Sequence, residues 1–417
     1  MKTENKKLIK QGSWYTIGLI CCLACNWLII MLLPKFTDFE KTGFYSLAYS
    51  TSQLFYIISV FSLRDYQVIS NYDTISERTF FSFRLYTCIL SFVTCIFYSL
   101  LLGYNGSLFL IIVLFLISNT IVAIAEVMLG TLQIKERLEI NGYSGIIVTF
   151  CKLFFFFSSL RVTQNFYIAV FFGEIIPSII YFFVIYFFYI KIAKIKAPYN
   201  ICWSKDFICI AKNTLPLLAI NFITIFITTY PRIIIEKKES PVILGYYSIL
   251  ISIANIIPSI TTTLFTPLLS LYASLYKNKE IKKLAVMHIK VFALCFCMCL
   301  LIIAASFFIL PPLFRWYYGN DLLEYINVFH IGMIGVCFLS MAQVARPVLL
   351  SANKNNLMLL ILFVSAIPLL ILTPVLVSKY SALGAALALL VSYLLFFVFS
   401  TLATFMIFSI ARRKTKI

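Results

Sequence analysis

The chain has 417 residues, of which 62% are hydrophobic and only 12% charged. A soluble domain is typically about 45–50% apolar and about 25% charged, so this composition excludes an ordinary soluble protein. Lys and Arg number 34 against 16 Asp and Glu, a net charge of +18, but the basic residues are not distributed like those of a nucleic-acid-binding protein. We therefore expect a membrane protein with no nucleic-acid partner. At about 20 residues per span, the chain has room for about twelve transmembrane helices.

Apolar runs of spanning length follow one another along the whole chain. In the first half they lie at about 13–33, 44–63, 84–103, 107–131, 143–161 and 166–190. In the second half they lie at about 213–233, 244–268, 288–310, 324–346, 357–377 and 382–410. The first run is too long for a signal peptide and lacks a small-residue cleavage site, so it is interpreted as a retained helix. The sequence predicts an all-α polytopic membrane protein.

The basic residues indicate an orientation. If the N-terminus is cytoplasmic, 25 of the 34 Lys and Arg lie on the cytoplasmic side, near anionic lipid headgroups, and eight lie outside. By the positive-inside rule both termini are predicted to be cytoplasmic. The basic central loop, residues 191–212, is interpreted as a linker between an N-terminal lobe, 1–190, and a C-terminal lobe, 213–417.

The two halves resemble each other. Residues 43–47, GFYSL, open the second span, and residues 245–249, GYYSI, open the eighth. Because six helices separate these spans, both halves enter the membrane in the same direction. This predicts two six-helix lobes related by a pseudo-two-fold axis along the membrane normal, with a site between them.

Polar residues recur at helical spacing in the matched spans. They are Ser46, Ser50 and Gln53 in span two, Asn221, Thr224, Thr228 and Arg232 in span seven, and Ser248, Ser252, Asn255, Ser259, Thr262 and Thr266 in span eight. Each set is expected on one helix face. Such a face either packs against another helix through small hydroxyl residues or lines a water-filled cavity.

Ionisable residues deep in a membrane usually face a cavity or a partner, because each costs about 2.5–3.5 kcal/mol to insert. Lys152 lies in the middle of span five and is the strongest candidate, with Glu126 in span four and Glu174 in span six. Two interpretations stay open: Lys152 is part of a functional site, or it forms a structural ion pair with Glu126 or Glu174. Arg64, Arg84 and Arg346 lie near span ends, where basic side chains also extend toward the headgroups.

Enzymatic signatures are sparse. The sequence lacks a phosphate-binding loop motif and has only two histidines, far apart. The 12 cysteines lie mostly in apolar spans and are interpreted as small buried residues, so no cofactor and no metal are expected. One acidic pair, Asp38 and Glu40, lies in the first external loop. These two acids either belong to a solvated loop or hold a metal, as acidic pairs do in membrane glycosyltransferases that use lipid-linked sugars.

Several short stretches are more specific. They are residues 33–35 (LPK), 43–48 (GFYSLA), 64–67 (RDYQ), 230–232 (YPR), 235–236 (IE), 244–248 (LGYYS), 351–354 (SANK) and 380–386 (YSALGAA). With the helix count, they make the chain resemble the Wzx-type flippases of the bacterial polysaccharide transporter family. That family belongs to the multidrug/oligosaccharidyl-lipid/polysaccharide exporter superfamily. Where many relatives have Asp before the span-seven arginine, this chain has Pro231, so no role of that acid is transferred.

The resemblance implies alternating access and export of an undecaprenyl-diphosphate-linked oligosaccharide across the bacterial inner membrane, for O-antigen or capsule. Coupling to H⁺ or Na⁺, and a polysaccharide polymerase and chain-length regulator as partners, are also implied. On this hypothesis the substrate-binding residues are Lys152, Arg232, Arg64, Asn255, Ser252, Asn221 and Gln53, and the ion-coupling residues are Glu126 and Glu174. Tyr45, Tyr49 and Tyr56 share a face of span two and either stack on sugar rings or pack.

Two alternatives remain. A multidrug or cation exporter of the same superfamily would need an acidic cavity, whereas the deep charges here are of both signs. A membrane glycosyltransferase or polysaccharide polymerase would need Asp38 and Glu40. The expectation is a transporter rather than an enzyme.

Overall fold

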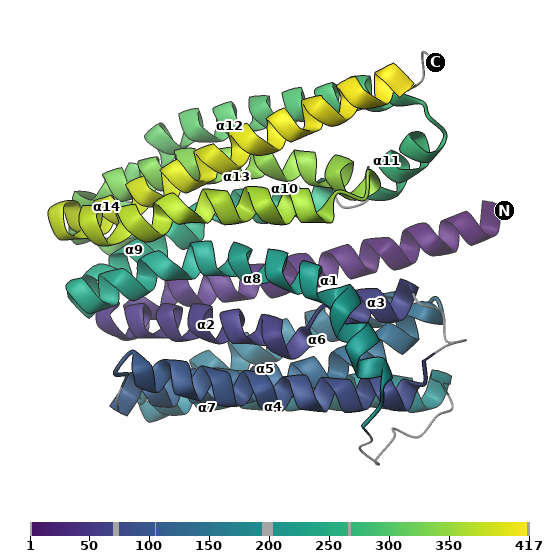
Figure 1. The fold of residues 1–417 in the computed structure, drawn as a ribbon. Coiled ribbons are helices and arrows are strands. Elements are labelled where there is room, and N and C mark those ends of the chain that lie inside the picture. The colour runs from purple at the N-terminus through teal and green to yellow at the C-terminus, as the bar shows by residue number, and fades with distance from the viewer. Residues whose placement is uncertain (1, 70–74, 105, 194–202, 266–267, 415–417) are drawn as a thin grey trace. The chain divides into compact units, whose positions relative to one another are not determined.

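The computed structural model describes residues 2–69, 75–104, 106–193, 203–265 and 268–414, and every regular element within them is a helix (Figure 1). The chain forms two compact units, Met1–Ile225 and Phe226–Ile417, here called the N-terminal and C-terminal lobes. The predicted linker falls partly on residues 194–202, which lie outside the described residues. The rest of the predicted linker includes the start of a helix at Asp206.

The N-terminal lobe contains seven complete helices within the described residues: α1 (Lys2–Phe36), α2 (Phe39–Val60), α3 (Leu63–Ile69), α4 (Glu77–Leu101), α5 (Gly106–Ile134), α6 (Glu139–Thr163) and α7 (Phe166–Ala193). Helix α8 (Asp206–Lys238) begins in this lobe and continues into the next. The C-terminal lobe continues with α9 (Pro241–Ala254), α10 (Ile256–Phe265), α11 (Leu268–Lys277), α12 (Ile281–Tyr318), η1 (Asp321–Tyr325), α13 (Ile326–Ser351) and α14 (Asn355–Lys414).

The predicted multi-span helical fold is confirmed. In the described residues, ten helical segments are long and apolar enough to cross a membrane. Helix α2 covers a further predicted span, and its 22 residues include many buried hydroxyl groups that lower its hydropathy. Helix α14 contains two predicted spans, because Ser381 interrupts it with φ 52° and ψ −134°. Each of the twelve predicted spans is therefore mainly helical in the residues that the structure describes.

The prediction of one continuous helix over 244–268 was wrong in one detail. Helix α9 ends at Ala254 and α10 begins at Ile256, with Asn255 between them. Pro258 explains the interruption, since its nitrogen has no hydrogen to donate to the carbonyl of Ala254. The predicted polar stripe is interrupted at the same place. Its members Thr266 and the side chain of Thr262 lie outside the described residues.

The fourth long helix is central in each lobe. In the N-terminal lobe α5 packs against α2, α4 and α7, and in the C-terminal lobe α13 packs against α9, α10, α12 and α14. A short helix also follows the second span in both lobes, α3 in the first and α11 in the second. The internal repeat therefore extends beyond the residues that reveal it in the sequence.

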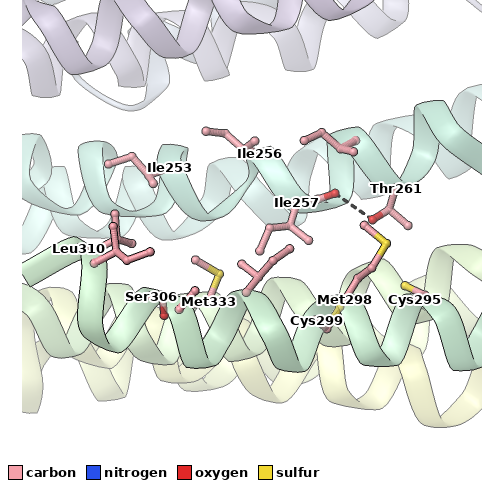
Figure 2. A pocket seen from close by; sticks show the side chains of 14 residues that line it. Ile253, Ile256, Ile257, Thr261, Cys295, Met298, Cys299, Ser306, Leu310 and Met333 are labelled. Atoms are coloured by element: carbon pink, nitrogen blue, oxygen red, sulfur yellow. Dashed lines mark hydrogen bonds between the residues drawn. The ribbon is translucent and has the colours of Figure 1, made fainter. Parts of the chain in front are cut away.

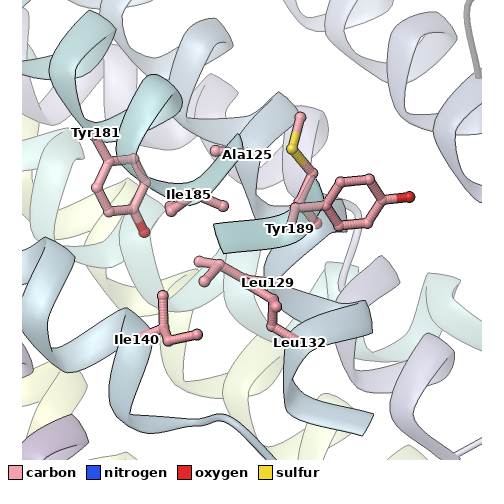
Figure 3. Close-up of a cluster of buried hydrophobic side chains, with 8 residues drawn as sticks. Ala125, Leu129, Leu132, Ile140, Tyr181, Ile185 and Tyr189 are labelled. Atoms are coloured by element: carbon pink, nitrogen blue, oxygen red, sulfur yellow. The ribbon is translucent and has the colours of Figure 1, made fainter. Parts of the chain in front are cut away.

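Apolar packing holds the N-terminal lobe together where α5, α6 and α7 meet (Figure 3). The buried side chains there are Ala125, Met128, Leu129, Leu132, Ile140, Tyr181, Ile185 and Tyr189. Nearby, α1 and α6 approach so closely that a Cβ on Gly18 would lie 2.5 Å from the carbonyl oxygen of Gly142. Small residues at such crossings allow the close packing by which membrane helices associate.

Candidate functional site

An ion pair between two spans lies inside the N-terminal lobe. Lys152, near the middle of α6, places its ammonium 2.8 Å from the carboxylate of Glu174 in α7. The side chains are 13% and 5% exposed. The ammonium also donates to Asn26 Oδ1 of α1 at 3.0 Å, and the Tyr45 hydroxyl of α2 donates to Glu174 at 3.0 Å. A buried charge pair is tolerated when further hydrogen bonds satisfy both partners, as they do here.

This ion pair borders a small polar cavity of about 190 Å³, here called the lysine cavity. Its polar lining residues are Asn26, Tyr49, Gln53, Ser118, Asn119, Thr149, Lys152, Glu174 and Ser178. Gln53, predicted as a substrate ligand, donates to Asn119 Oδ1 at 3.4 Å. Of the two partners that the sequence offers for Lys152, Glu126 and Glu174, the structure pairs it with Glu174.

A second ion pair joins α3 to α5. The Arg64 guanidinium donates to the Glu126 carboxylate at 3.0 Å and, through Nε, to Gln133 Oε1 at 3.0 Å. Burial of the guanidinium acts to lower the pKa of Arg64, but the facing Glu126 outweighs it and raises this pKa above its usual value. Arg64 therefore stays cationic at any physiological pH.

The Arg64 pair lines a larger cavity of about 480 Å³, here called the arginine cavity. Its polar lining residues are Tyr15, Tyr56, Ser62, Arg64, Asp65, Glu126, Gln133, Asn141, Tyr181 and Asn221. Cys22, Val122 and Val148 line both this cavity and the lysine cavity, so the two are adjacent. Aromatic rings, amides and opposite charges in one cavity can contact a sugar ring, its hydroxyl groups and an attached anion.

A tight elbow between α2 and α3 positions Arg64. Phe61 and Ser62 both have φ 49°, a left-handed conformation that non-glycine residues rarely adopt in succession. The Arg84 guanidinium and the Thr87 hydroxyl both donate to the carbonyl of Ser59, in the last turn of α2. Asn221 of α8 donates to the Ser62 hydroxyl at 3.3 Å.

Arg84 corrects one sequence-based interpretation. It does not extend toward headgroups: its side chain is 0% exposed and points into the lobe. A cation that reaches the carbonyl end of a helix is stabilised by the helix dipole. Arg84 is thus a positioning residue at the elbow.

The predicted residues of the C-terminal lobe, Arg232, Ser252 and Asn255, line neither of these two cavities. Arg232 is 6% exposed and donates to the carbonyl of Thr228, and its guanidinium lies 6.0 Å from the centre of the Tyr247 ring. Ser252 is buried. Asn255 is half-buried at the junction of α9 and α10.

The C-terminal lobe instead has an apolar pocket of about 320 Å³ between the α9–α10 segment and α12 (Figure 2). Isoleucines, Cys295, Met298 and Cys299 dominate its lining. The hydroxyls of Thr261 and Ser306, which also line it, donate to carbonyls of their own helices. The pocket therefore offers little to a charged or sugar-bearing ligand.

Sequence reasoning missed two ligands of the ion pair, Asn26 and Tyr45. Asn26 is a polar residue in the middle of an apolar span, which could have identified it. Tyr45 was expected to stack on sugar or to pack. It is 0% exposed and its ring packs edge-on against Phe115 and Phe156, so stacking on sugar is excluded in this conformation. Of the three tyrosines that share a face of α2, Tyr56 lines the arginine cavity.

The acidic pair lies at the N-terminus of α2 rather than in a loop. Asp38 is the N-cap of α2 and accepts from the backbone nitrogen of Lys41 at 2.7 Å. Its carboxylate also lies 2.8 Å from the Lys41 ammonium. Glu40 lies in the first turn of α2, where the helix dipole favours an acid. Both acids are therefore placed to stabilise the N-terminus of α2, Asp38 as its cap and Glu40 through the helix dipole.

No protein-family model matches the chain. It is 26% identical over 397 residues to the capsular polysaccharide biosynthesis protein CapF of Staphylococcus aureus, covering 92% of this chain and 96% of CapF. Its fold is similar to that of the lipid II flippase MurJ in an inward closed conformation, with a TM-score of 0.72 and 14% identity over 95% of this chain and 87% of MurJ.

A multidrug resistance MATE family transporter of the MOP superfamily, in an inward-facing conformation, is also similar. The TM-score is 0.67 at 10% identity, and the similarity covers 96% of each chain. At such identities the solved structures establish the fold alone. The chain is therefore a multi-pass membrane protein whose two-lobed helical fold is similar to those of MurJ and of a MOP-superfamily transporter, and whose sequence is similar to that of a capsular polysaccharide biosynthesis protein.

Proposed function

We propose that the protein is a flippase that moves an undecaprenyl-diphosphate-linked oligosaccharide from the cytoplasmic to the external leaflet of a bacterial inner membrane. Both termini are cytoplasmic, and the exported unit supplies capsule or O-antigen synthesis by a polymerase and its chain-length regulator. The observation that carries the proposal is the pair of adjacent polar cavities, each with a buried ion pair, inside the N-terminal lobe. The similarity to CapF supports a role in surface polysaccharide.

The arginine cavity is the proposed headgroup site. Its guanidinium can form two parallel hydrogen bonds to a phosphate, the geometry in which arginine binds this group most strongly. Tyr56 and Tyr181 offer ring faces to sugars, and Asn221 offers an amide. The polyprenyl tail stays in the lipid.

The remaining predicted ligands have smaller roles. Gln53 and Lys152 line the adjacent lysine cavity and bind polar groups that extend into it. In the C-terminal lobe Asn255 is only half-buried and can contact a ligand directly. Arg232 and Ser252 are buried in this conformation, so they bind substrate only after a conformational change.

Proton coupling follows from competition for the two cations. An incoming diphosphate displaces Glu126 from Arg64, and the displaced carboxylate is the proposed carrier of the coupled proton. Glu174 acts in the same way when Lys152 turns toward substrate. Alternating access then carries the substrate and the proton in opposite directions.

The proposal is tested in a strain that lacks the gene and retains all other steps of polysaccharide synthesis. Inverted and right-side-out membrane vesicles are treated with a membrane-impermeant reagent that oxidises sugars. In the deletion strain the lipid-linked oligosaccharide should react in inverted vesicles only, and the restored gene should make it reactive in right-side-out vesicles. Equal reactivity in right-side-out vesicles with and without the gene would refute flipping.

The two alternatives give different results. A multidrug exporter predicts greater drug sensitivity of the deletion strain with no trapped lipid-linked sugar. A glycosyltransferase or polymerase predicts loss of activity when Asp38 and Glu40 are both replaced by their amides, Asn and Gln. A flippase should tolerate that change, because the Asn side chain still accepts at the N-cap of α2.

A further inference from the structure

The Lys152 ammonium is enclosed by groups from four other helices. Glu174 and Asn26 supply oxygen atoms at 2.8 and 3.0 Å. Two aromatic rings lie beside it, with centres 6.0 Å away for Tyr49 and 5.8 Å for Phe115. These residues come from α7, α1, α2 and α5, and the lysine itself from α6.

The enclosing groups suit a monovalent cation as well as an ammonium. Carboxylate and amide oxygens are hard ligands of the kind that alkali and alkaline-earth cations prefer. Ring faces attract any cation, whatever its identity. Glu174 is the acid in the set, so one positive charge neutralises it.

The set is also held in place independently of the lysine. Tyr45 donates to Glu174, Asn26 donates through its nitrogen to the Tyr49 hydroxyl at 3.2 Å, and Ser118 donates to the Glu174 backbone carbonyl at 3.2 Å. The oxygen ligands therefore keep their orientation if the ammonium is removed.

We infer that Asn26, Glu174 and Tyr49 form a monovalent-cation site whose occupant is the chain's own Lys152 ammonium. A free Na⁺ cannot enter while the ammonium is present, since two like charges would share one carboxylate. The wild-type protein therefore needs no Na⁺ at this site. The existence of this site does not depend on the proposed function. Its consequence for transport does rest on that function: Na⁺ does not act through Glu174.

The test measures the melting temperature of the purified, detergent-solubilised protein in NaCl and in choline chloride at equal ionic strength and mildly alkaline pH. Lys152→Met removes the charge and shortens the side chain by one atom, which leaves the place of the ammonium nitrogen open. We expect Na⁺ to raise the melting temperature of this variant saturably, by on the order of 2 °C, as for any ligand that binds only the folded state. Wild type should show no difference between the two salts.

Two controls isolate the site. The double variant Lys152→Met/Glu174→Gln lacks the carboxylate and should lose the response to Na⁺. Lys41→Met removes an ammonium from an exposed ion pair with Asp38 at 2.8 Å and should behave like wild type. A wild-type response to Na⁺, or a Lys152→Met variant that melts identically in both salts, would overturn the inference.

A second variant covers the case in which Lys152→Met does not fold. Lys152→Ala leaves space for a small primary amine, and ethylammonium should raise its melting temperature but not that of wild type, whereas no effect on the Ala variant contradicts the site. All these measurements report binding to purified protein. They therefore stand or fall separately from the vesicle experiment that tests flipping.

Discussion

Lys152 and Glu174 connect α6 to α7 through an ion pair of 2.8 Å in which neither side chain is more than 13% exposed. Both positions are surrounded by apolar residues in sequence, so each charge requires a partner within the protein. The pair satisfies that requirement for both helices at once. Because the pair joins two helices, replacing either residue alters the interactions of both.

The first prediction concerns this pair. Glu174→Gln leaves the ammonium without a counter-charge and should destabilise the folded protein by about 3–5 kcal/mol, the usual result of removing one partner of a buried pair. The double variant Lys152→Met/Glu174→Gln removes both charges and should recover most of the loss. Thermal melting of the purified variants measures both effects. A double variant less stable than Glu174→Gln would show that the ammonium has other, stronger partners.

The second prediction concerns Arg64. Arg64 reaches Gln133 through Nε and Glu126 through Nη1, whereas lysine has a single nitrogen and lacks this planar fork, so it would bind the two partners less well. Arg64→Lys should therefore lower polysaccharide export at matched protein level and destabilise the protein by about 1–3 kcal/mol, through a buried group left unsatisfied.

Arg137 offers the matched control for Arg64. It pairs with Glu139 at 2.7 Å, but its side chain is 44% exposed, so Arg137→Lys should change stability by about 0–1 kcal/mol and leave export intact. Equal export defects in the two variants would show that the Arg64 pair has no special role.

The sequence predicts the spans well and their mutual contacts poorly, for a physical reason. Hydropathy is a local property, so α14 was divided correctly on either side of Ser381. Whether Lys152 faces Glu126 or Glu174 depends on how helices far apart in the chain are rotated, and no local pattern encodes that rotation. Arg84 shows the same limit: its position near a span end is compatible with headgroup contact, and the elbow at Phe61 decides otherwise.

The interruption at Asn255 is a different case. Pro258 was visible in the sequence, and the loss of its N–H predicts a local break. The polar stripe by itself favours a continuous helix, but the structure interrupts it where the proline removes a donor. Backbone chemistry was the better guide at this point.

The third prediction tests the close contact of α1 and α6. Gly18→Ala would place a methyl group 2.5 Å from the carbonyl oxygen of Gly142, and the two helices would have to separate. Overpacking of this kind destabilises by about 1–3 kcal/mol. Gly12, also in α1, has nothing within 4 Å of the equivalent position, so Gly12→Ala should be neutral or stabilise by up to about 1 kcal/mol. The melting temperature of Gly18→Ala should fall, and that of Gly12→Ala should rise or stay unchanged.

The fourth prediction concerns Ser381, where α14 changes direction with φ 52° and ψ −134°. An L-residue in such a conformation is strained by about 1–3 kcal/mol, whereas glycine adopts it freely. Ser381→Gly should therefore raise the melting temperature, in spite of the greater flexibility of the unfolded chain. Ser378 lies three residues earlier and has helical geometry. Ser378→Gly should instead destabilise the folded protein by about 0.5–1 kcal/mol, because glycine is unfavourable inside a helix. It also removes the hydroxyl that accepts from Lys238 at 2.7 Å. If both substitutions destabilise alike, the backbone at Ser381 is not strained, and the division of α14 depends on its packing against α13 rather than on this residue.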